Sequence, residues 1–234
     1  MLEIRALGGS GEDSRNYSNV SGNNKAFANC TDMSFMFSFC KKLSSIDMAE
    51  WDTSNVTNMD NMFAQLGNNR TDTFVLDVSN LNTSSVTNFK LMFDANTKTS
   101  DFVGLHKFNT SSATTFEGMF YNCSAVTKLD LSSFTTTHVT NINNMFYMYN
   151  NDNKLTTIYV NSAQWDGTIS SDANVFPCTH GSAHMVGGTG VHWSNINVKG
   201  DMAKVDEGYF TDYLDPAYKD DFPAGYAYHN SNNP

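Results

Sequence analysis

Charged residues are scarce in this sequence of 234 residues, and the positively charged ones are the scarcer kind. Lys, Arg, Asp and Glu make up 16% of the chain, whereas they make up about a quarter of an ordinary globular protein. The 14 Lys and Arg residues face 24 Asp and Glu, which gives a formal net charge of −10. Binding of nucleic-acid phosphates needs clustered Lys and Arg, so this balance argues against a nucleic acid as the main partner.

The sequence also lacks a long hydrophobic run. No segment approaches the ~18–20 apolar residues that cross a bilayer, so we expect no membrane span. Residues 1–9 have neither the basic start nor the apolar centre of a signal peptide. We expect either that Met1 is a true start and the chain does not follow the general secretion route, or that the sequence is a slice of a longer polypeptide.

What the sequence does contain is a repeat. The dipeptide Met-Phe recurs at 36–37, 62–63, 92–93, 119–120 and 145–146, with spacings of 26, 30, 27 and 26 residues. A short apolar stretch precedes each of the four later copies at a similar distance, and a fifth stretch follows the last copy. These stretches are centred on Ile46, Leu76, Leu105, Leu129 and Ile158. Self-similarity at this period predicts a solenoid, because one such unit cannot bury its own apolar surface and must stack on its neighbours.

Each unit is expected to contain one short helix and one short strand. Apolar residues at offsets 0, 3, 6 and 7, such as Val56, Met59, Met62 and Phe63, have the spacing of one helical face. The Thr or Asn just after offset 0 suits a helix N-cap. The apolar stretches alternate like strands. Strands pack about 4.8 Å apart and helices about 8–10 Å apart, which predicts an α/β solenoid with a parallel β-sheet on the concave side and short helices on the convex side.

The repeat divides the chain into four parts. We expect an N-terminal lead-in or cap at 1–25, the solenoid at 26–178, a C-terminal cap at 179–212, and a tail or docking segment at 213–234. Extra residues fall between a helix and the next strand, in loops such as 67–72 and 97–101. Loops gathered on one edge can form a binding surface, although simple drift in length explains them equally well.

Two strings carry a resemblance to a known family. "LDLSSFTTTHVTNINNMFYM" (129–148) and "WDTSNVTNMDNMF" (51–63) resemble the BspA-type leucine-rich repeat surface proteins, over roughly residues 26–212. The resemblance implies a leucine-rich-repeat array, attachment to host proteins, surfaces or other cells, and no catalytic residues. The chain departs from the pattern at Lys107, which replaces the last aliphatic residue of its strand, at Ala113, which replaces Val, and at 165–178, which has lost Met-Phe.

The expected sheet face offers two candidate binding features. A polar row follows the strand centres and could select a basic partner or a cation, while a solvated polar ladder is the simpler explanation. The row is Asp47, Asp77, His106, Asp130 and Tyr159. Outward-facing apolar residues would form a small contact patch, unless the loop at 67–72 covers them. They are Phe74, Val75 and Val103.

Metal, disulfide and catalytic sites are not expected. Cys178, His180, His184 and His192 are residue types that bind metals, but no zinc-site template fits their spacing. Cys40 and Cys123 share the repeat position of a Leu, which predicts free thiols packed as small apolar groups. The sequence has no nucleophile elbow, His-Glu-x-x-His motif or phosphate-binding loop, so we expect neither an enzyme nor a cofactor.

Two functional hypotheses follow. The first is a non-enzymatic adhesion module, extracellular or on a cell surface, that attaches to a protein or glycan of a host or neighbouring cell through the sheet face and the loop edge. The second is a structural or decoration subunit of a virus or phage particle or a surface lattice, in which the aromatic tail at 213–234 docks on a neighbouring subunit.

Overall fold

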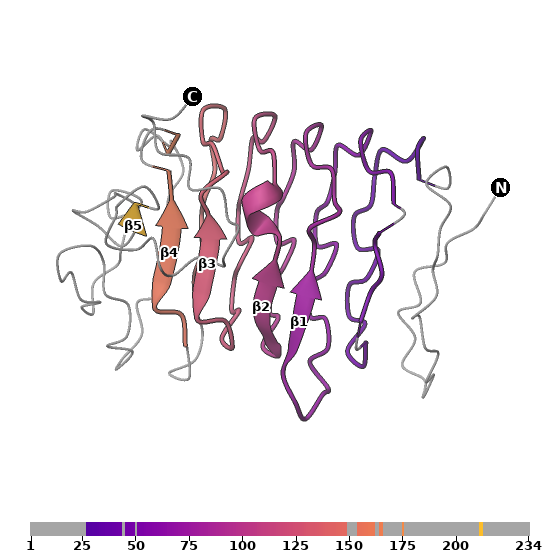
Figure 1. Ribbon diagram of the computed structural model, residues 1–234, viewed down its shortest axis with the longest axis vertical. Coiled ribbons are helices and arrows are strands. Elements are labelled where there is room, and N and C mark those ends of the chain that lie inside the picture. Colours follow the sequence, from indigo (N-terminus) through magenta and orange to yellow (C-terminus); the bar gives the residue numbers. More distant parts are fainter. Residues whose placement is uncertain are drawn as a thin grey trace.

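The computed structural model describes residues 27–43, 45–49, 51–148, 154–161, 164–165, 175 and 211–212. In this part of the chain the repeats lie side by side, with their strands pointing the same way (Figure 1). The elements are β1 (Phe74–Asp77), β2 (Thr99–Val103), the 3-10 helix η2 (Leu105–Lys107), β3 (Lys128–Leu131), β4 (Thr157–Val160) and β5 (Thr211–Asp212). The strands form two parallel sheets, β1–β2 and β3–β4–β5.

The strands are paired so that one side chain in two faces the core. Leu76 of β1 lies opposite Phe102 of β2, and both are buried. Leu129 of β3 lies opposite Ile158 of β4 in the same way. Alternate residues of a strand point to opposite faces, so this register leaves the residues between them on the outer face.

A second line of backbone pairing joins the repeats away from these strands. One residue per repeat forms an isolated parallel bridge to its counterpart in the next. These residues are Asp32, Asn58, Asn88, Thr115 and Asn141. Some of their side chains also form hydrogen bonds with one another. For example, Asn88 Nδ2 donates to Asn58 Oδ1 at 3.0 Å. The repeats are therefore held together by hydrogen bonds on two sides of the stack.

The short helices expected around each Met-Phe pair do not form in the described residues; tight turns take their place. Successive amides alternate between two kinds of acceptor. The Met62 amide donates to Met59 O of its own repeat at 3.2 Å, whereas the Asn61 and Phe63 amides donate to carbonyls of the next repeat, both at 2.9 Å. An α-helix would use every amide internally, but here half of them are used to join repeats.

Because alternate amides point to opposite acceptors, the backbone must adopt a left-handed conformation at the same positions of each repeat. The residue before each Met-Phe pair has a positive φ, and so does the second residue after most of these pairs. These residues are Phe35, Asn61, Leu91, Gly118 and Asn144, then Phe39, Gln65, Ala95 and Asn122. Turns closed between residues three apart also bring every third side chain inward, so the apolar spacing fits turns as well as a helix.

The expected role as a helix N-cap of the Thr that follows offset 0 is also wrong. Thr57 Oγ1 donates to Thr31 O at 3.1 Å, and Thr87 Oγ1 donates to Thr57 O at 3.1 Å. Each hydroxyl thus bonds to the preceding repeat. Without helices, the spacing mismatch from which we expected a concave sheet face is removed as well.

The core contains a column of stacked phenylalanine rings, one from each Met-Phe pair. Ring centroids along the column are 5.7, 5.8, 5.5 and 5.9 Å apart, and no two neighbouring planes differ by more than 19°. The column runs through Phe37, Phe63, Phe93, Phe120 and Phe146. Adjacent aromatic pairs contribute about 0.5–1.5 kcal/mol beyond the area they bury. The Phe residues of the repeat therefore lie in the core, where all rings of the column but that of Phe37 are fully buried.

Candidate functional site

The polar row expected from the sequence lies on the outer face of the strands, except that a different residue occupies the position expected for His106. Asp77 of β1 lies opposite Val103 of β2, so Val103 takes the place expected for His106. Gly104, with a φ of 94°, ends β2, and His106 then falls in η2. The expected strand centre at Leu105 and the expected loop at 97–101 are both wrong, because β2 occupies Thr99–Val103. Lys107 accordingly lies in η2 and does not end a strand.

Each aspartate of the row accepts a hydrogen bond from a backbone amide of the loop that follows it. Asp47 Oδ1 accepts the Ala49 amide at 3.0 Å, Asp77 Oδ1 accepts the Ser79 amide at 2.9 Å, and Asp130 Oδ1 accepts the Ser132 amide at 3.1 Å. This bond from a side chain to the amide two residues on is ordinary turn chemistry for Asp. Each turn occupies one carboxylate oxygen, which explains why the repeat has Asp at this position without any ligand.

Two members of the row are not surface residues of the expected kind. Tyr159, opposite Asp130, is buried at 3% exposure. His106 is half-buried; burial lowers the pKa of its imidazole, and the nearby Asp130 carboxylate opposes that shift. Of the expected row, only the aspartates keep the position and the surface character that were expected, and the buried Tyr159 cannot present its ring to a partner.

Two of the three expected apolar contacts are exposed. Val75 is 51% exposed and lies opposite Asp101, while Val103 is 39% exposed and lies opposite Asp77. The two Val and two Asp side chains thus alternate across β1 and β2, and we call these four residues the Val–Asp patch. Burial raises the pKa of Asp101, and within the described residues no cationic side chain pairs with Asp77 or Asp101.

Phe74 is covered, as one of the two alternatives predicted. Its half-buried ring packs against the core, and the Arg70 guanidinium lies 5.5 Å from the ring centroid. Gly67, with a φ of 66°, lies so close that a Cβ there would collide with the Phe74 ring. The loop at 67–72 therefore shields Phe74 and leaves the neighbouring Val75 open.

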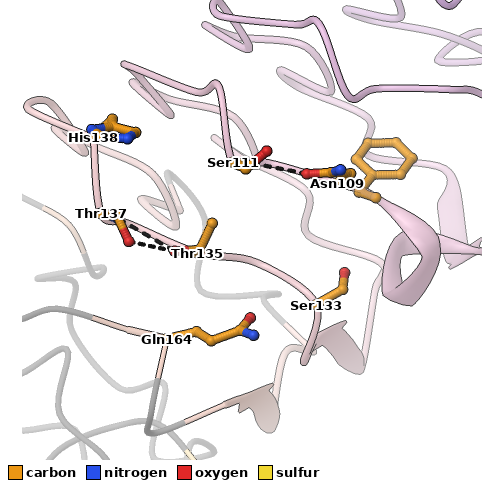
Figure 2. A pocket seen from close by; sticks show the side chains of 8 residues that line it. Asn109, Ser111, Ser133, Thr135, Thr137, His138 and Gln164 are labelled. Atoms are coloured by element: carbon orange, nitrogen blue, oxygen red, sulfur yellow. Dashed lines mark hydrogen bonds between the residues drawn. The ribbon is translucent and has the colours of Figure 1, made fainter.

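A hollow in the loops that follow β2, β3 and β4 was missed by the sequence analysis. Its volume is ≈ 440 Å³, and Figure 2 shows two short loops facing each other across it, with Gln164 and His138 at its border. We call it the His138 hollow. It is lined by Phe108, Asn109, Ser111, Ser133, Thr135, Thr137, His138 and Gln164. Hydrogen bonds fix both loops: the Ser111 amide donates to Asn109 Oδ1 at 3.0 Å, and the Thr135 and Thr137 hydroxyls are 2.8 Å apart.

Comparison with known proteins identifies a family for this chain. A family model described as "Mycoplasma protein of unknown function, DUF285" matches residues 31–165, more than half of the chain. The chain belongs to the DUF285 family. No curated protein matches the chain, and no solved structure matches it. The DUF285 match covers the Phe column, the Val–Asp patch and the whole lining of the His138 hollow.

The first repeat of the DUF285 segment exposes two aromatic side chains that the sequence analysis also missed. Phe35 is 48% exposed and Phe39 is 52% exposed, although both have a positive φ, which bulky residues rarely adopt. Lys41 Nζ lies 5.5 Å from the centre of the Phe39 ring. A signal was present in the sequence, because the equivalent positions of the next repeat are Asn61 and Gln65.

The described part of the DUF285 chain contains no cluster of three or more His, Cys, Asp or Glu that could hold a metal. Cys30, Cys40 and Cys123 are free thiols; Cys123 is fully buried, and its burial raises its pKa. No described helix is long and apolar enough to cross a membrane. The weak metal candidates, which are Cys178, His180, His184 and His192, lie outside the described residues, as does the tail at 213–234.

Proposed function

We propose that this DUF285 chain is a non-enzymatic binding module of the BspA type. In this proposal its repeats form a leucine-rich-repeat-like solenoid that works outside the cell or on its surface. The side-by-side parallel strands and the Phe column support the solenoid. The module attaches to a protein or glycan of a host or neighbouring cell through the outer face of its strands.

The Val–Asp patch is the observation that supports binding most directly. The apolar side chains of Val75 and Val103 are 51% and 39% exposed, and Asp77 and Asp101 add negative charge beside them. Apolar side chains mixed with charges of one sign suit a partner segment with apolar and positively charged residues.

The test uses substitutions that keep the turns intact. Asp77→Asn still offers an oxygen to the Ser79 amide, as Asn82 does for Ser84 in the same repeat. Surface plasmon resonance would compare the native protein, Asp77→Asn and Asp101→Asn for binding to an immobilised peptide of alternating Arg and Val. Asp52→Asn is the control, because Asp52 also caps a turn, at Ser54, but does not belong to the patch.

We expect the patch variants to bind the peptide several-fold more weakly than the native protein and the Asp52→Asn control to bind as the native protein does. Raising the salt concentration should weaken native binding most, because the attraction between exposed charges is screened. Equal binding by all four proteins, or equal binding to a peptide of alternating Glu and Val, would remove the Val–Asp patch from the proposal.

The second candidate, a structural subunit of a particle or surface lattice, is supported by the exposed Phe35 and Phe39 rings. Subunit contacts favour exposed aromatic side chains. Phe35→Asn with Phe39→Gln would introduce the residues of the next repeat, Asn61 and Gln65, which adopt the same positive φ. Analytical ultracentrifugation should show a native oligomer that dissociates in the double variant; a native monomer at high concentration would reject this candidate.

A further inference from the structure

We infer that the His138 hollow is a binding site for one uncharged sugar unit. One of the repeats that line the hollow departs twice from the pattern of the others. The hollow lies in loops beyond the ends of the strands and includes no residue of the Val–Asp patch. The inference therefore does not depend on what the strand face binds.

The first departure is at Thr135. In the three preceding repeats the equivalent residue is Asp52, Asn82 or Asn109, whose Oδ1 accepts the amide two residues on at 3.0–3.1 Å. Thr135 accepts the Thr137 amide with its hydroxyl, at 3.4 Å. Thr135 thus performs the same capping role with a hydroxyl in place of a carboxamide, which changes the chemistry of the lining.

The second departure is at His138. The equivalent residues Ser85 and Ser112 each donate a hydrogen bond to a carbonyl of the preceding repeat, at 2.6 and 2.8 Å. The His138 ring makes no hydrogen bond within the described part of the chain. It is exposed at the border of the hollow, where both of its nitrogens can meet a ligand (Figure 2).

The chemistry of the lining restricts the class of ligand. Apart from the buried ring of Phe108, the side chains are hydroxyls, carboxamides and one imidazole, with no Asp, Glu, Lys or Arg. A cation would lack a carboxylate, an anion would lack a guanidinium or ammonium group, and an apolar ligand would leave buried polar groups without partners. A neutral ligand with many hydroxyls meets none of these objections, and a sugar is such a ligand.

Several lining groups have hydrogen-bonding capacity left over, and one of them, Asn109, is already held in place. Asn109 uses Oδ1 for the Ser111 amide, so its orientation is fixed while its Nδ2 remains available. The Ser111 hydroxyl and the Gln164 carboxamide have no partner in the described residues. A group fixed before binding, such as Asn109, loses little entropy when a ligand arrives. The hollow, of ≈ 440 Å³, is open to solvent, so a single sugar unit would keep part of its surface in water.

The test is an NMR titration of the full chain with the methyl glycosides of glucose, galactose, mannose and N-acetylglucosamine. We expect at least one of them to shift the His138 ring resonances and the amides of 109–111 and 135–138, with a dissociation constant of about 1 mM. N-acetylneuraminic acid and glucosamine, which carry a negative and a positive charge, serve as charged comparisons and should bind more weakly.

Asn109→Asp keeps the oxygen that accepts the Ser111 amide and removes the Nδ2 donor. It should weaken sugar binding by about tenfold. Asn82→Asp is the matched control one repeat earlier, where Asn82 caps Ser84 in the same way. Thr135→Asn with His138→Ser restores the usual repeat pattern and removes the His138 ring from the border of the hollow. It should abolish the shifts and leave the melting temperature unchanged or higher.

Four results would overturn the site: no shift at the lining residues with any of the four glycosides, tighter binding of a charged sugar, equal weakening by Asn82→Asp and Asn109→Asp, or native affinity in the Thr135→Asn, His138→Ser protein. Asp77→Asn should leave the titration unchanged. A failure of the strand-face proposal is thereby distinguishable from a failure of this one.

Discussion

The rings of Phe63 and Phe93 are parallel to within 6°, with their centroids 5.8 Å apart, although 30 residues separate them in the sequence. Phe93 also contacts Phe120 and Phe102, at 5.5 and 4.6 Å between centroids. It therefore joins three repeats, and its neighbours cannot close around a smaller side chain without breaking their own stacking.

We expect Phe93→Ala to lower the free energy of unfolding by about 3–5 kcal/mol, the usual cost of removing a buried Phe. Urea denaturation followed by circular dichroism would measure the change. Phe39→Ala is the control, because Phe39 is 52% exposed, and it should change stability by about 0.5 kcal/mol or less. Equal losses in the two variants would contradict the role given to the Phe column.

The hydroxyl of Thr83 is expected to be required for joining two repeats. It donates to Asn109 O at 3.0 Å and accepts the Asn109 amide at 2.9 Å, and the side chain is 1% exposed. Thr83→Val keeps the shape but leaves both backbone groups unpaired, which should cost about 2 kcal/mol or more in denaturation experiments. Thr83→Ser keeps the hydroxyl and should retain most of the stability.

Ala95 is expected to gain stability on replacement by Gly. Its φ is 53°, a left-handed conformation that costs an L-residue with a Cβ about 1–2 kcal/mol. Ala95→Gly should therefore raise the free energy of unfolding by about 1 kcal/mol. Ala49 is exposed and is not among the residues with a positive φ, so Ala49→Gly should lower stability. A loss in both variants would contradict the left-handed backbone at Ala95.

Asp94 should make stability depend on pH. Burial raises the pKa of Asp94 to about 6, whereas the pKa of Asp in an unfolded chain is about 3.9. The folded protein thus binds this proton more tightly than the unfolded chain does, and stability increases as the pH falls from above 6 towards 4.

The check compares denaturation of the native protein with that of Asp94→Asn over this pH range, because contributions from other groups cancel in the difference. The variant should be the more stable protein above pH ~6, by an amount on the order of 1–2 kcal/mol. The two curves should converge as the carboxyl becomes protonated. A difference that is constant with pH would show that burial does not affect Asp94 in this way.

Much of the core was predictable, because apolar residues repeat in register. Met62 and Phe63 recur with the same partners in every copy, so their inward position followed from the sequence and is confirmed by their full burial. The strand register at Leu76 was predictable only in part. Its partner is Phe102, not Leu105, because Gly104 and η2 insert extra residues after β2.

The local backbone could not be predicted from the same pattern. Offsets of three and four residues suit an α-helix, and they also suit turns in which alternate amides bond to the next repeat, as those of Asn61 and Phe63 do. Sequence periodicity reports which side chains are inside and does not report where the amides find their acceptors. The His138 hollow was missed for a different reason: it is lined where Thr135 and His138 depart from the residues of the other repeats, and a search for what recurs does not reveal departures.

The alternating amides also set the order in which the repeats are completed during synthesis. The amides of Asn61, Phe63 and Gln65 donate to carbonyls that lie about 30 residues further along, at Lys90, Met92 and Asp94. During synthesis a repeat leaving the ribosome has these donors unsatisfied until the following repeat has emerged. Each repeat is thus completed by its successor, and a ribosome that stalls within the array leaves the newest repeat with three amides facing water.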